Sequence, residues 1–426
     1  MWVLLEPEDV LLFRDSRPFT AGEDFRAEGR FPPLPPPVAG AIRSSLLQPA
    51  LRAAGKTFAD FADSARTTPE LQEIRDALGE ADTMGRLHLA GPLVCRFTPG
   101  IVDVVDAAQP LFPLPADLLG QQVPRPSDGP PPGLRKPVRG LPGGLMPMTI
   151  AAPQGAGSSG TSAETGEWLD MHAMTDYLTG AVRVTPERLD DAPTDEETRT
   201  GIEIAAGSRT VESGKFYTVQ VQRPRWQSGK EKATGLLVQA QTPDGYPVRD
   251  GYLPLGGEGR SMYLRCLADY QPALDRDGAR TAIAQAICRD EGRFRLYLAT
   301  PGVFAGVAGN GVIPSALAAG QHAGLRFRLV ALASGKPVLV GGWDLARGAP
   351  RPLRRAVPAG TVYYGQLESP CVEAALHLLA QFHFRTTLQG EDALPEAAYR
   401  AQTGFGLTLV GAWAKPPDAA APGNTL

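Results

Sequence analysis

Residues 404–413 read GFGLTLVGAW, and this stretch decides how the second half of the chain is interpreted. Two closely spaced glycines precede a run of apolar, partly β-branched residues that is typical of a buried strand. A dinucleotide-binding glycine motif follows a strand and opens a helix, whereas these glycines follow an expected helix and open an expected strand. The chain also lacks a GxxxxGK[ST] motif. The stretch therefore predicts a closing strand and excludes a Rossmann or P-loop site here.

The segments that precede this strand predict the rest of one structural unit. The alternating pattern of 293–300 predicts a half-buried strand, and 325–345 predicts two strands around a Ser-Gly-Lys-Pro turn. Another strand is expected at 361–368, followed by a helix over 371–384. That helix places four apolar residues on one side: Val372, Leu376, Leu379 and Phe382. This order of elements is compatible with a βαββαβ ferredoxin-like unit.

The first half of the chain predicts a similar but more interrupted unit. It opens with a strand over 1–7, followed by a helix that begins at Pro37 and has one apolar face: Val38, Ile42 and Leu46. A second helix is expected between Thr68, which can cap it, and Gly79, which ends it, and a strand follows at 87–97. We therefore expect an α+β fold of two ferredoxin-like domains, at 1–285 and 286–426.

The composition changes sharply at about 107–165, where Pro, Gly and Ser dominate. Such a stretch buries too little apolar surface to fold independently, and it is predicted to be a long surface insertion or linker. By contrast, 199–225 reads as a β-hairpin that projects from the first domain.

The charge is unevenly distributed along the chain. The formal net charge of −4 does not indicate a nucleic-acid binder, but 133–143, 199–230 and 345–365 are locally basic. The last of these stretches contains no acidic residue and four arginines: Arg347, Arg351, Arg354 and Arg355. Local patches of this kind attract phosphates whatever the total charge, although a solvated surface has the same composition.

Other features bound the class of protein. The start of the chain does not resemble a secretory signal, and no apolar stretch is long enough to span a bilayer, so we expect a cytoplasmic protein without membrane contact. The four cysteines form no CxxC pair, so neither a zinc site nor a disulfide framework is indicated: Cys95, Cys266, Cys288 and Cys371. No metal or cofactor is expected.

Five stretches together resemble a known family. They lie in the same order as in that family, at 11–46 (LLFRDSRPF…), 198–218 (TRTGIEIAAGSRTVESGKFYT), 253–260 (LPLGGEGR), 341–365 (GGWDLARGAPRPLRRAVPAGTVYYG) and 404–413. The chain resembles the third-subunit family of the Cmr complex, the type III-B CRISPR effector, within the RAMP superfamily. The insertion at about 107–165 is longer and richer in proline than this family leads us to expect.

The resemblance implies a pair of ferredoxin-like, RRM-related domains and a function in antiviral defence. It implies a non-catalytic RNA-binding subunit of a hetero-oligomeric ribonucleoprotein, which grips the 5′ handle of the crRNA. It also implies that the subunit bridges the large cyclase-bearing subunit to the backbone subunit. In this family, cleavage of target RNA belongs to the backbone subunit, and DNA cleavage and cyclic-oligonucleotide synthesis belong to the large one.

Candidate RNA-binding residues fall into three groups. Glycines let a backbone approach a sugar–phosphate chain closely, which singles out Gly404, Gly406 and Gly411, and also Gly256, Gly257 and Gly259 beside Arg260. The hairpin offers Arg199, Arg209, Lys215 and Tyr217, the last as a stacking surface or as a core-facing strand residue. The N-terminal motif and first helix offer Arg14, Arg17 and Arg43, with Arg14–Asp15 as a structural ion pair in the competing interpretation.

Two other functions stay open at this point. Some RAMP relatives cleave precursor RNA with a histidine as general acid or base, but none of the five histidines lies in a recognisable catalytic motif: His88, His172, His322, His377 and His383. A structural role is the better hypothesis for each. A pure scaffold that binds only protein is the other alternative, and it would not need glycine-rich turns beside cations.

Overall fold

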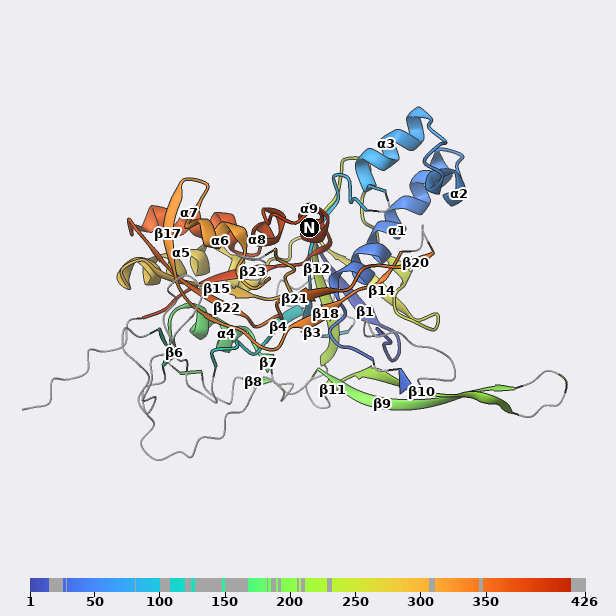
Figure 1. Cartoon of the computed structure of the whole chain (residues 1–426), viewed down its shortest axis with the longest axis horizontal. Helices are drawn as coiled ribbons and strands as arrows, with labels where there is room; N and C mark the ends of the chain where they lie inside the picture. Colours follow the sequence, from blue (N-terminus) through green and yellow to red (C-terminus); the bar gives the residue numbers. More distant parts are fainter. Residues whose placement is uncertain are drawn as a thin grey trace, which may run out of the picture.

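Two antiparallel sheets form the body of the molecule, and a smaller sheet projects from it as a long arm (Figure 1). The computed structural model describes residues 1–14, 26–27, 29–80, 82–99, 108–118, 123, 125–126, 148–149, 168–181, 183–184, 189–190, 193–204, 207, 211–227, 232–305, 311–344 and 348–414. The predicted α+β class is confirmed. No helix in these ranges is both long and apolar enough to cross a membrane.

The first sheet has nine strands. Its order is β13 (Gly251–Pro254), β14 (Ser261–Leu267), β1 (Trp2–Pro7), β12 (Lys232–Gln241), β3 (His88–Phe97), β4 (Ala108–Pro113), β7 (Trp168–Leu169) and β8 (Leu189–Asp190), with β11 (Trp226–Gln227) also paired to β12. The opening strand and the strand expected at 87–97 are thus confirmed, and both lie near the middle of this sheet.

The second sheet has five strands. Its order is β16 (Gln321–His322), β17 (Leu325–Ala333), β22 (Val362–Leu367), β15 (Arg293–Leu298) and β23 (Thr408–Ala412). The predicted closing strand is therefore β23. Three two-stranded pairs complete the described strands: β18 (Val338–Val340) with β21 (Arg354–Ala356), β19 (Trp343–Asp344) with β20 (Ala349–Pro350), and β5 (Arg125–Pro126) with β6 (Met148–Thr149).

Four strands of each sheet repeat one arrangement. In the first sheet β14, β1, β12 and β3 are neighbours in that order, and in the second β23, β15, β22 and β17 are neighbours in the same relative order. Numbered along the chain within each set, both read 4-1-3-2, and every pairing is antiparallel. The two halves of the chain therefore share a core topology, although different helices connect their strands.

The helices cover both sheets. They are α1 (Pro35–Ala53), α2 (Phe58–Ala62), α3 (Pro69–Leu78), α4 (Met171–Leu178), the 3₁₀ helix η4 (Ala273–Asp275), α5 (Asp277–Arg289), α6 (Ser315–Ala319), α7 (Val372–Phe382), α8 (Thr387–Gly390) and α9 (Ala397–Thr403). Helix α3 has the predicted Thr68 cap and ends at Gly79, whereas α1 begins at Pro35, two residues before Pro37. Helices α5 and α7 lie on one side of the second sheet and α4 on the other (Figure 1).

The central strand β1 is buried on both faces, because each face belongs to a different core. Val3 and Leu5 pack in a core with α1 and α3. Trp2 and Leu4 pack in a second core, which includes residues of both large sheets. In that shared core the Trp2 ring makes edge-on contacts with Phe384, which follows α7, at 6.1 Å between centroids. The two halves of the chain are thus joined by apolar packing, and not only by a connecting segment.

Three sequence predictions need correction. The proposed insertion at 107–165 is wrong at its start, because β4 is a buried strand of the first sheet whose Phe112 lies in the shared core. Strand β15 is not half-buried, since Arg295 is only 1% exposed. In α7 the buried face includes Ala375 and Leu378, while Leu376 is 40% exposed. The buried face is therefore turned about the helix axis relative to the predicted one.

A buried ionic network explains why Arg295 lies inside. Its guanidinium packs over the Tyr177 ring at 4.0 Å from Cζ to the centroid, and its Nε donates to the carbonyl of Ala412. One Nη lies 3.8 Å from the Asp117 carboxylate, which accepts hydrogen bonds from the hydroxyls of Tyr177 and Tyr364. Burial raises the pKa of Asp117, and Arg295 opposes that rise. The network fixes the segment after β4 against the second sheet.

His383 at the end of α7 is held in its neutral form. Its Nε2–H donates to the carbonyl of Leu274 at 2.9 Å, and its Nδ1 accepts from the N–H of Val410 at 3.0 Å. Only a neutral imidazole with the proton on Nε2 can make both bonds. Burial lowers the pKa of His383 to about 4. This is the structural role that we expected for a histidine of this chain.

His383 predicts a loss of stability in mild acid. The His383 imidazole binds a proton near pH 6.5 in the unfolded chain and only near pH 4 in the folded one. Its contribution to the free energy of unfolding is therefore fully present above pH 6.5 and is lost as the pH falls from 6.5 to 4. Between pH 7 and pH 5 this residue alone is expected to lower the free energy of unfolding by about 2 kcal/mol. Urea denaturation at a series of pH values measures the slope.

The control for this prediction is His383→Gln. Its amide can bond the same two backbone groups but does not titrate, so the dependence of its unfolding free energy on pH should be flatter over this range. The other histidines and the carboxylates are common to both proteins and cancel in the comparison. Equal slopes in the two proteins would contradict the prediction.

Candidate nucleic-acid interface

The projecting arm is the predicted hairpin. Strands β9 (Thr194–Ile204) and β10 (Val211–Pro224) pair antiparallel from Thr194 opposite Pro224 onward, and β2 (Arg26–Ala27) pairs in parallel with β10. Figure 1 shows the arm extending well beyond the body. The hairpin begins five residues before the predicted boundary. Near its outer end Ile202 and Ile204 are about half exposed, at 48% and 58%, because no second layer covers them.

The base of the hairpin is joined to the segment that follows β1. Leu11 exchanges two backbone hydrogen bonds with Gln222, at 2.7 and 2.9 Å. The Leu12 carbonyl accepts from the N–H of Gly257 at 2.7 Å, so this amide is already engaged within the protein. Gly259, in contrast, has open space where a Cβ would lie. The structure thus places the loop 256–260 at the base of the hairpin. Nothing in the sequence indicated that these two segments meet.

The cations at the hairpin base are paired with acids. Arg260 lies 2.5 Å from Asp9 and 3.8 Å from Glu258. Arg199 bonds Glu197, a contact that raises the pKa of Arg199. Exposed pairs of this kind contribute little to stability, but they neutralise the local charge. The predicted residues Arg199 and Arg260 therefore provide no excess positive charge here.

The glycine-rich loop 404–411 is buried within the protein, so the prediction that it faces a phosphate chain is wrong. Gly404 ends α9 with a φ of +107°, and a Cβ at this position would lie 2.0 Å from the carbonyl oxygen of Gly91 in β3. A Cβ on Gly406 would lie 2.7 Å from the Cβ of Gln389, and one on Gly411 would lie 2.7 Å from the Cα of Leu178. The missing side chains of these three glycines make room for protein backbone and side chains, and not for RNA.

A different cationic surface forms around α9. We call Arg43, Arg351, Arg354 and Arg400 the arginine cluster. They come from α1, from the segment before β21, from β21 itself and from α9, in that order. Two carboxylates contact it: Glu396 lies 3.0 Å from Arg354 and 3.6 Å from Arg400, and Asp82 lies 3.4 Å from Arg351. The Arg351 guanidinium also packs over the Tyr399 ring at 5.2 Å. Within the described part of the chain, these four cations face two anions, which leaves excess positive charge there.

The pKa values of two members reflect this crowding. Burial lowers the pKa of Arg43, and the charge of Arg351 lowers it further while Tyr399 opposes the change. Burial also lowers the pKa of Arg400, and Arg354 adds to that effect while Glu396 opposes it. An anion placed among these side chains would relieve both repulsions. The cluster is therefore electrostatically suited to an acidic ligand.

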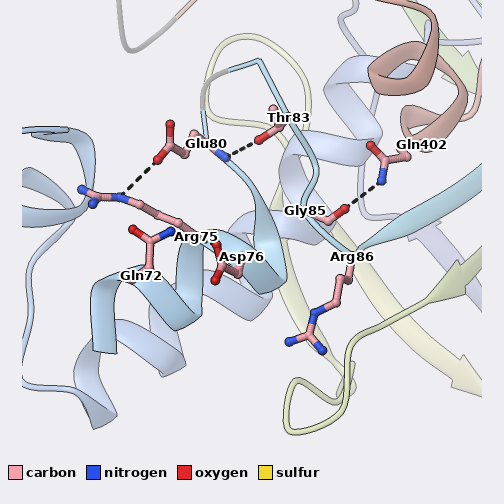
Figure 2. Close-up of a pocket in the computed structure, with 8 residues that line it drawn as sticks. All are labelled: Gln72, Arg75, Asp76, Glu80, Thr83, Gly85, Arg86 and Gln402. Carbon is pink, nitrogen blue, oxygen red and sulfur yellow. Dashed lines mark hydrogen bonds and ion pairs between the residues drawn. The ribbon is translucent and has the colours of Figure 1, made fainter. Parts of the chain in front are cut away.

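The loop that carries Asp82 is fixed from both sides. One Nη of Arg43 donates to the carbonyls of Glu80 and Thr83, at 2.7 and 3.0 Å. On the other side the loop borders a hollow of about 540 Å³ between α3 and α9 (Figure 2), where Gln402 donates to the carbonyl of Gly85 at 2.8 Å. Two arginines and two acids line that hollow, so its charge is balanced. These bonds hold one wall of the arginine cluster in place.

Of the other predicted site residues, the structure describes Arg14 and only part of the rest. Arg14 is exposed, and its backbone forms an isolated bridge with Gly29. Arg17 and Arg209 lie outside the described residues, as do Asp15 and the side chains of Lys215 and Tyr217, whose backbones belong to β10. Sequence reasoning did not single out Arg351, Arg354 or Arg400 as site residues. The signal for the first two was the basic stretch 345–365.

Two further histidines have partners within the protein. His88 lies 3.1 Å from the hydroxyl of Thr386, and His322 lies 2.8 Å from Glu391. Among the described residues no group of three His, Cys, Asp or Glu side chains is placed to hold a metal ion.

Comparison with known proteins identifies the family. A family model described as "CRISPR-associated protein (Cas_Cmr3)" matches residues 3–413. No curated protein matches the chain.

Two solved structures are similar over most of their length. One, a cryo-EM structure of the type III-B Cmr-beta bound to cognate target RNA and AMPPnP (state 1), has a TM-score of 0.45 and 15% identity, and covers 95% of each chain. The other, of Cmr-beta bound to cognate target RNA, has a TM-score of 0.44 and 13% identity, covering 85% of this chain and 86% of that one. Because the family model spans nearly the whole sequence, the chain belongs to the Cmr3 family of CRISPR-associated proteins.

Proposed function

We propose that this chain is a non-catalytic RNA-binding subunit of a type III-B CRISPR effector, and that it grips the 5′ handle of the crRNA. We also propose that it bridges the large cyclase-bearing subunit to the backbone subunit. The observation that carries the RNA-binding role is the arginine cluster, where, among the described residues, four guanidinium groups contact two carboxylates. The family membership supports the assignment to the effector.

The chemistry of arginine suits this role. A guanidinium presents several N–H donors in a planar fork that matches phosphate oxygens. Arg354 keeps 46% of its side chain exposed, and Arg351 keeps 28%, so both can reach a ligand while bound to their own carboxylates. Arg355, the next residue of β21, is also exposed. A phosphate chain that lies over α9 would contact these side chains from one side.

The hairpin supplies a second surface for RNA in this proposal. Among its described residues, Arg199 and Arg223 share Glu197 and Arg225 binds Asp195, so these cations are already engaged. The main contribution of the arm is therefore its shape, since it projects from the body (Figure 1) and can lie along a single strand. Arg14, Arg17, Arg209, Lys215 and Tyr217 remain the proposed contacts there. We further propose that the two halves, 1–285 and 286–426, are ferredoxin-like domains, on the basis of their common 4-1-3-2 strand order.

The test is the salt dependence of RNA binding. The double variant Arg351→Ala/Arg354→Ala should bind an oligonucleotide that carries the crRNA handle at least about tenfold more weakly at low salt, because two phosphate contacts are lost. The slope of log K against log salt concentration should become shallower by about 1.4, which is about 0.7 for each contact to a single strand. Fluorescence anisotropy measures both quantities.

The matched control is Arg289→Ala at the end of α5. Arg289 is exposed and paired with Asp290, but it lies outside the arginine cluster, so its replacement should leave affinity and slope unchanged. If the double variant binds with the slope of the unaltered chain, the cluster does not contact phosphates. A chain that binds no RNA, alone or assembled, would instead be a protein scaffold.

A further inference from the structure

A pair of tyrosines, one of them exposed, lies at the outer edge of the first sheet as the described residues define it. Tyr252 of β13 is 69% exposed and contacts Tyr263 of β14 edge-on, with ring centroids 5.0 Å apart. The two tyrosines are direct cross-strand partners in the register of β13 and β14. Tyr252 has the highest exposed fraction of the large apolar or aromatic side chains in the described part of the chain.

This pair is held in place from below. The Arg265 guanidinium packs over the Tyr263 ring at 5.4 Å, and its Nε lies 2.5 Å from the carboxylate of Glu6 on β1. Both Arg265 and Glu6 are mostly covered, with 19% and 16% of their side chains exposed. Because Tyr263 is fixed in this way, the Tyr252 ring rests on a rigid support. A rigid aromatic side chain loses little conformational entropy when a partner covers it.

The backbone N–H and C=O groups of Tyr252 point away from the neighbouring strand β14. The N–H of Leu255 donates to the carbonyl of Arg260, which makes these two residues a hydrogen-bonded pair. Hydrogen-bonded and non-bonded pairs alternate in an antiparallel ladder, so Tyr252 opposite Tyr263 is a non-bonded pair. The N–H and C=O of Tyr252 then point to the outer edge of β13, the last strand on this side of the described sheet.

The charge around the pair disfavours a nucleic acid. Arg265 is matched by Glu6, and Arg260 at the start of β14 is matched by Asp9 and Glu258. A phosphate chain requires excess positive charge, which this surface does not have. Tyr and Arg beside paired charges and an open strand edge are instead the composition of a protein interface.

We propose that a neighbouring protein subunit of the effector docks here, with an extended segment along the edge of β13 and an apolar pocket over the Tyr252 ring. The proposal rests on the proposed bridging role. Pro254 has no N–H, so the docked segment pairs with the backbone of Tyr252 and little more. Most of the affinity then comes from the ring, and association depends only weakly on salt.

The experiment compares three variants in assembly with the purified large and backbone subunits. Tyr252→Ala should bind one of the two subunits about thirtyfold more weakly, as expected for an aromatic hot spot, while Tyr252→Phe keeps the ring and should bind nearly as well as the unaltered chain. Phe58→Ala is the matched control, because Phe58 is 59% exposed on α2 and lies outside the proposed surface. Surface plasmon resonance at two salt concentrations measures the affinities.

Each outcome separates this proposal from the RNA-binding role. If Tyr252→Ala binds both subunits normally, the docking surface is disproved while RNA binding by the arginine cluster stands. If Tyr252→Ala instead weakens binding of the handle RNA, the tyrosines stack a nucleobase and the docking proposal is overturned. If the unaltered chain binds neither subunit, both the bridging role and this surface are wrong, whatever the RNA measurements give.

Discussion

Replacing Asp117 by alanine is expected to lower the free energy of unfolding by about 3–5 kcal/mol. The variant leaves the Arg295 guanidinium buried without its carboxylate, and it removes the acceptor of the Tyr177 and Tyr364 hydroxyls. A buried charge that loses its partner is far more costly than a pair that is never formed. Chemical denaturation followed by tryptophan fluorescence measures the change.

Two variants make the test specific. Asp195→Ala removes a carboxylate that also pairs with an arginine, Arg225, at 2.8 Å, but this pair is exposed on the hairpin. Its loss should cost less than about 1 kcal/mol. The double variant Asp117→Ala/Arg295→Met removes both buried charges and should recover part of the lost stability. If Asp117→Ala and Asp195→Ala have the same effect, Asp117 is not the centre of a buried network.

Gly404→Ala is expected to be nearly as damaging, at about 4 kcal/mol, because two penalties combine. The added Cβ would lie 2.0 Å from the Gly91 carbonyl oxygen, and the φ of +107° is one that residues with a side chain rarely adopt. The Gly91 oxygen belongs to the main chain, and the position of a Cβ is fixed by its own backbone, so neither atom can move without displacing α9 from β3. Thermal unfolding of the purified chain measures the effect.

A series of glycine variants separates the two penalties. Gly245→Ala has a φ of +86° but nothing within 4 Å of the new Cβ, so it should show only the backbone cost, about 1–3 kcal/mol. Gly278→Ala lies in α5 with open space and should raise stability by up to about 1 kcal/mol. If Gly404→Ala were no worse than Gly245→Ala, the close approach to Gly91 would carry no energetic weight.

Local patterns predicted many of the helices and strands because the relevant signals are short-range. The Thr68 cap and the Gly79 stop fix α3 within three turns of chain, and they needed no tertiary information. Arg295 could not be predicted in the same way. Its partner Asp117 lies in a proline-rich stretch that resembles a linker, and the two meet only in the folded structure. A cation in an alternating pattern therefore appeared to face solvent.

The candidate site shows the same division. The sequence marked a basic stretch at 345–365 and singled out Arg43, but nothing in either pattern indicated that they meet across α9. The glycines at 404–411 were misassigned for a related reason. Glycine permits close approach of any backbone, and the sequence does not say whether the neighbour is a nucleotide or, as here, Gly91 and Leu178 of the same chain.

The composition of the arginine cluster has a consequence for biosynthesis. A ribosome that has translated the first 340 residues has made only Arg43 of the four, because Arg351, Arg354 and Arg400 follow that point. Domains generally fold as units, starting from the N-terminal one, while the chain is still growing. The cationic surface is therefore absent until Arg351, Arg354 and Arg400 have been translated, and a chain that stops at residue 340 cannot present it to an acidic ligand.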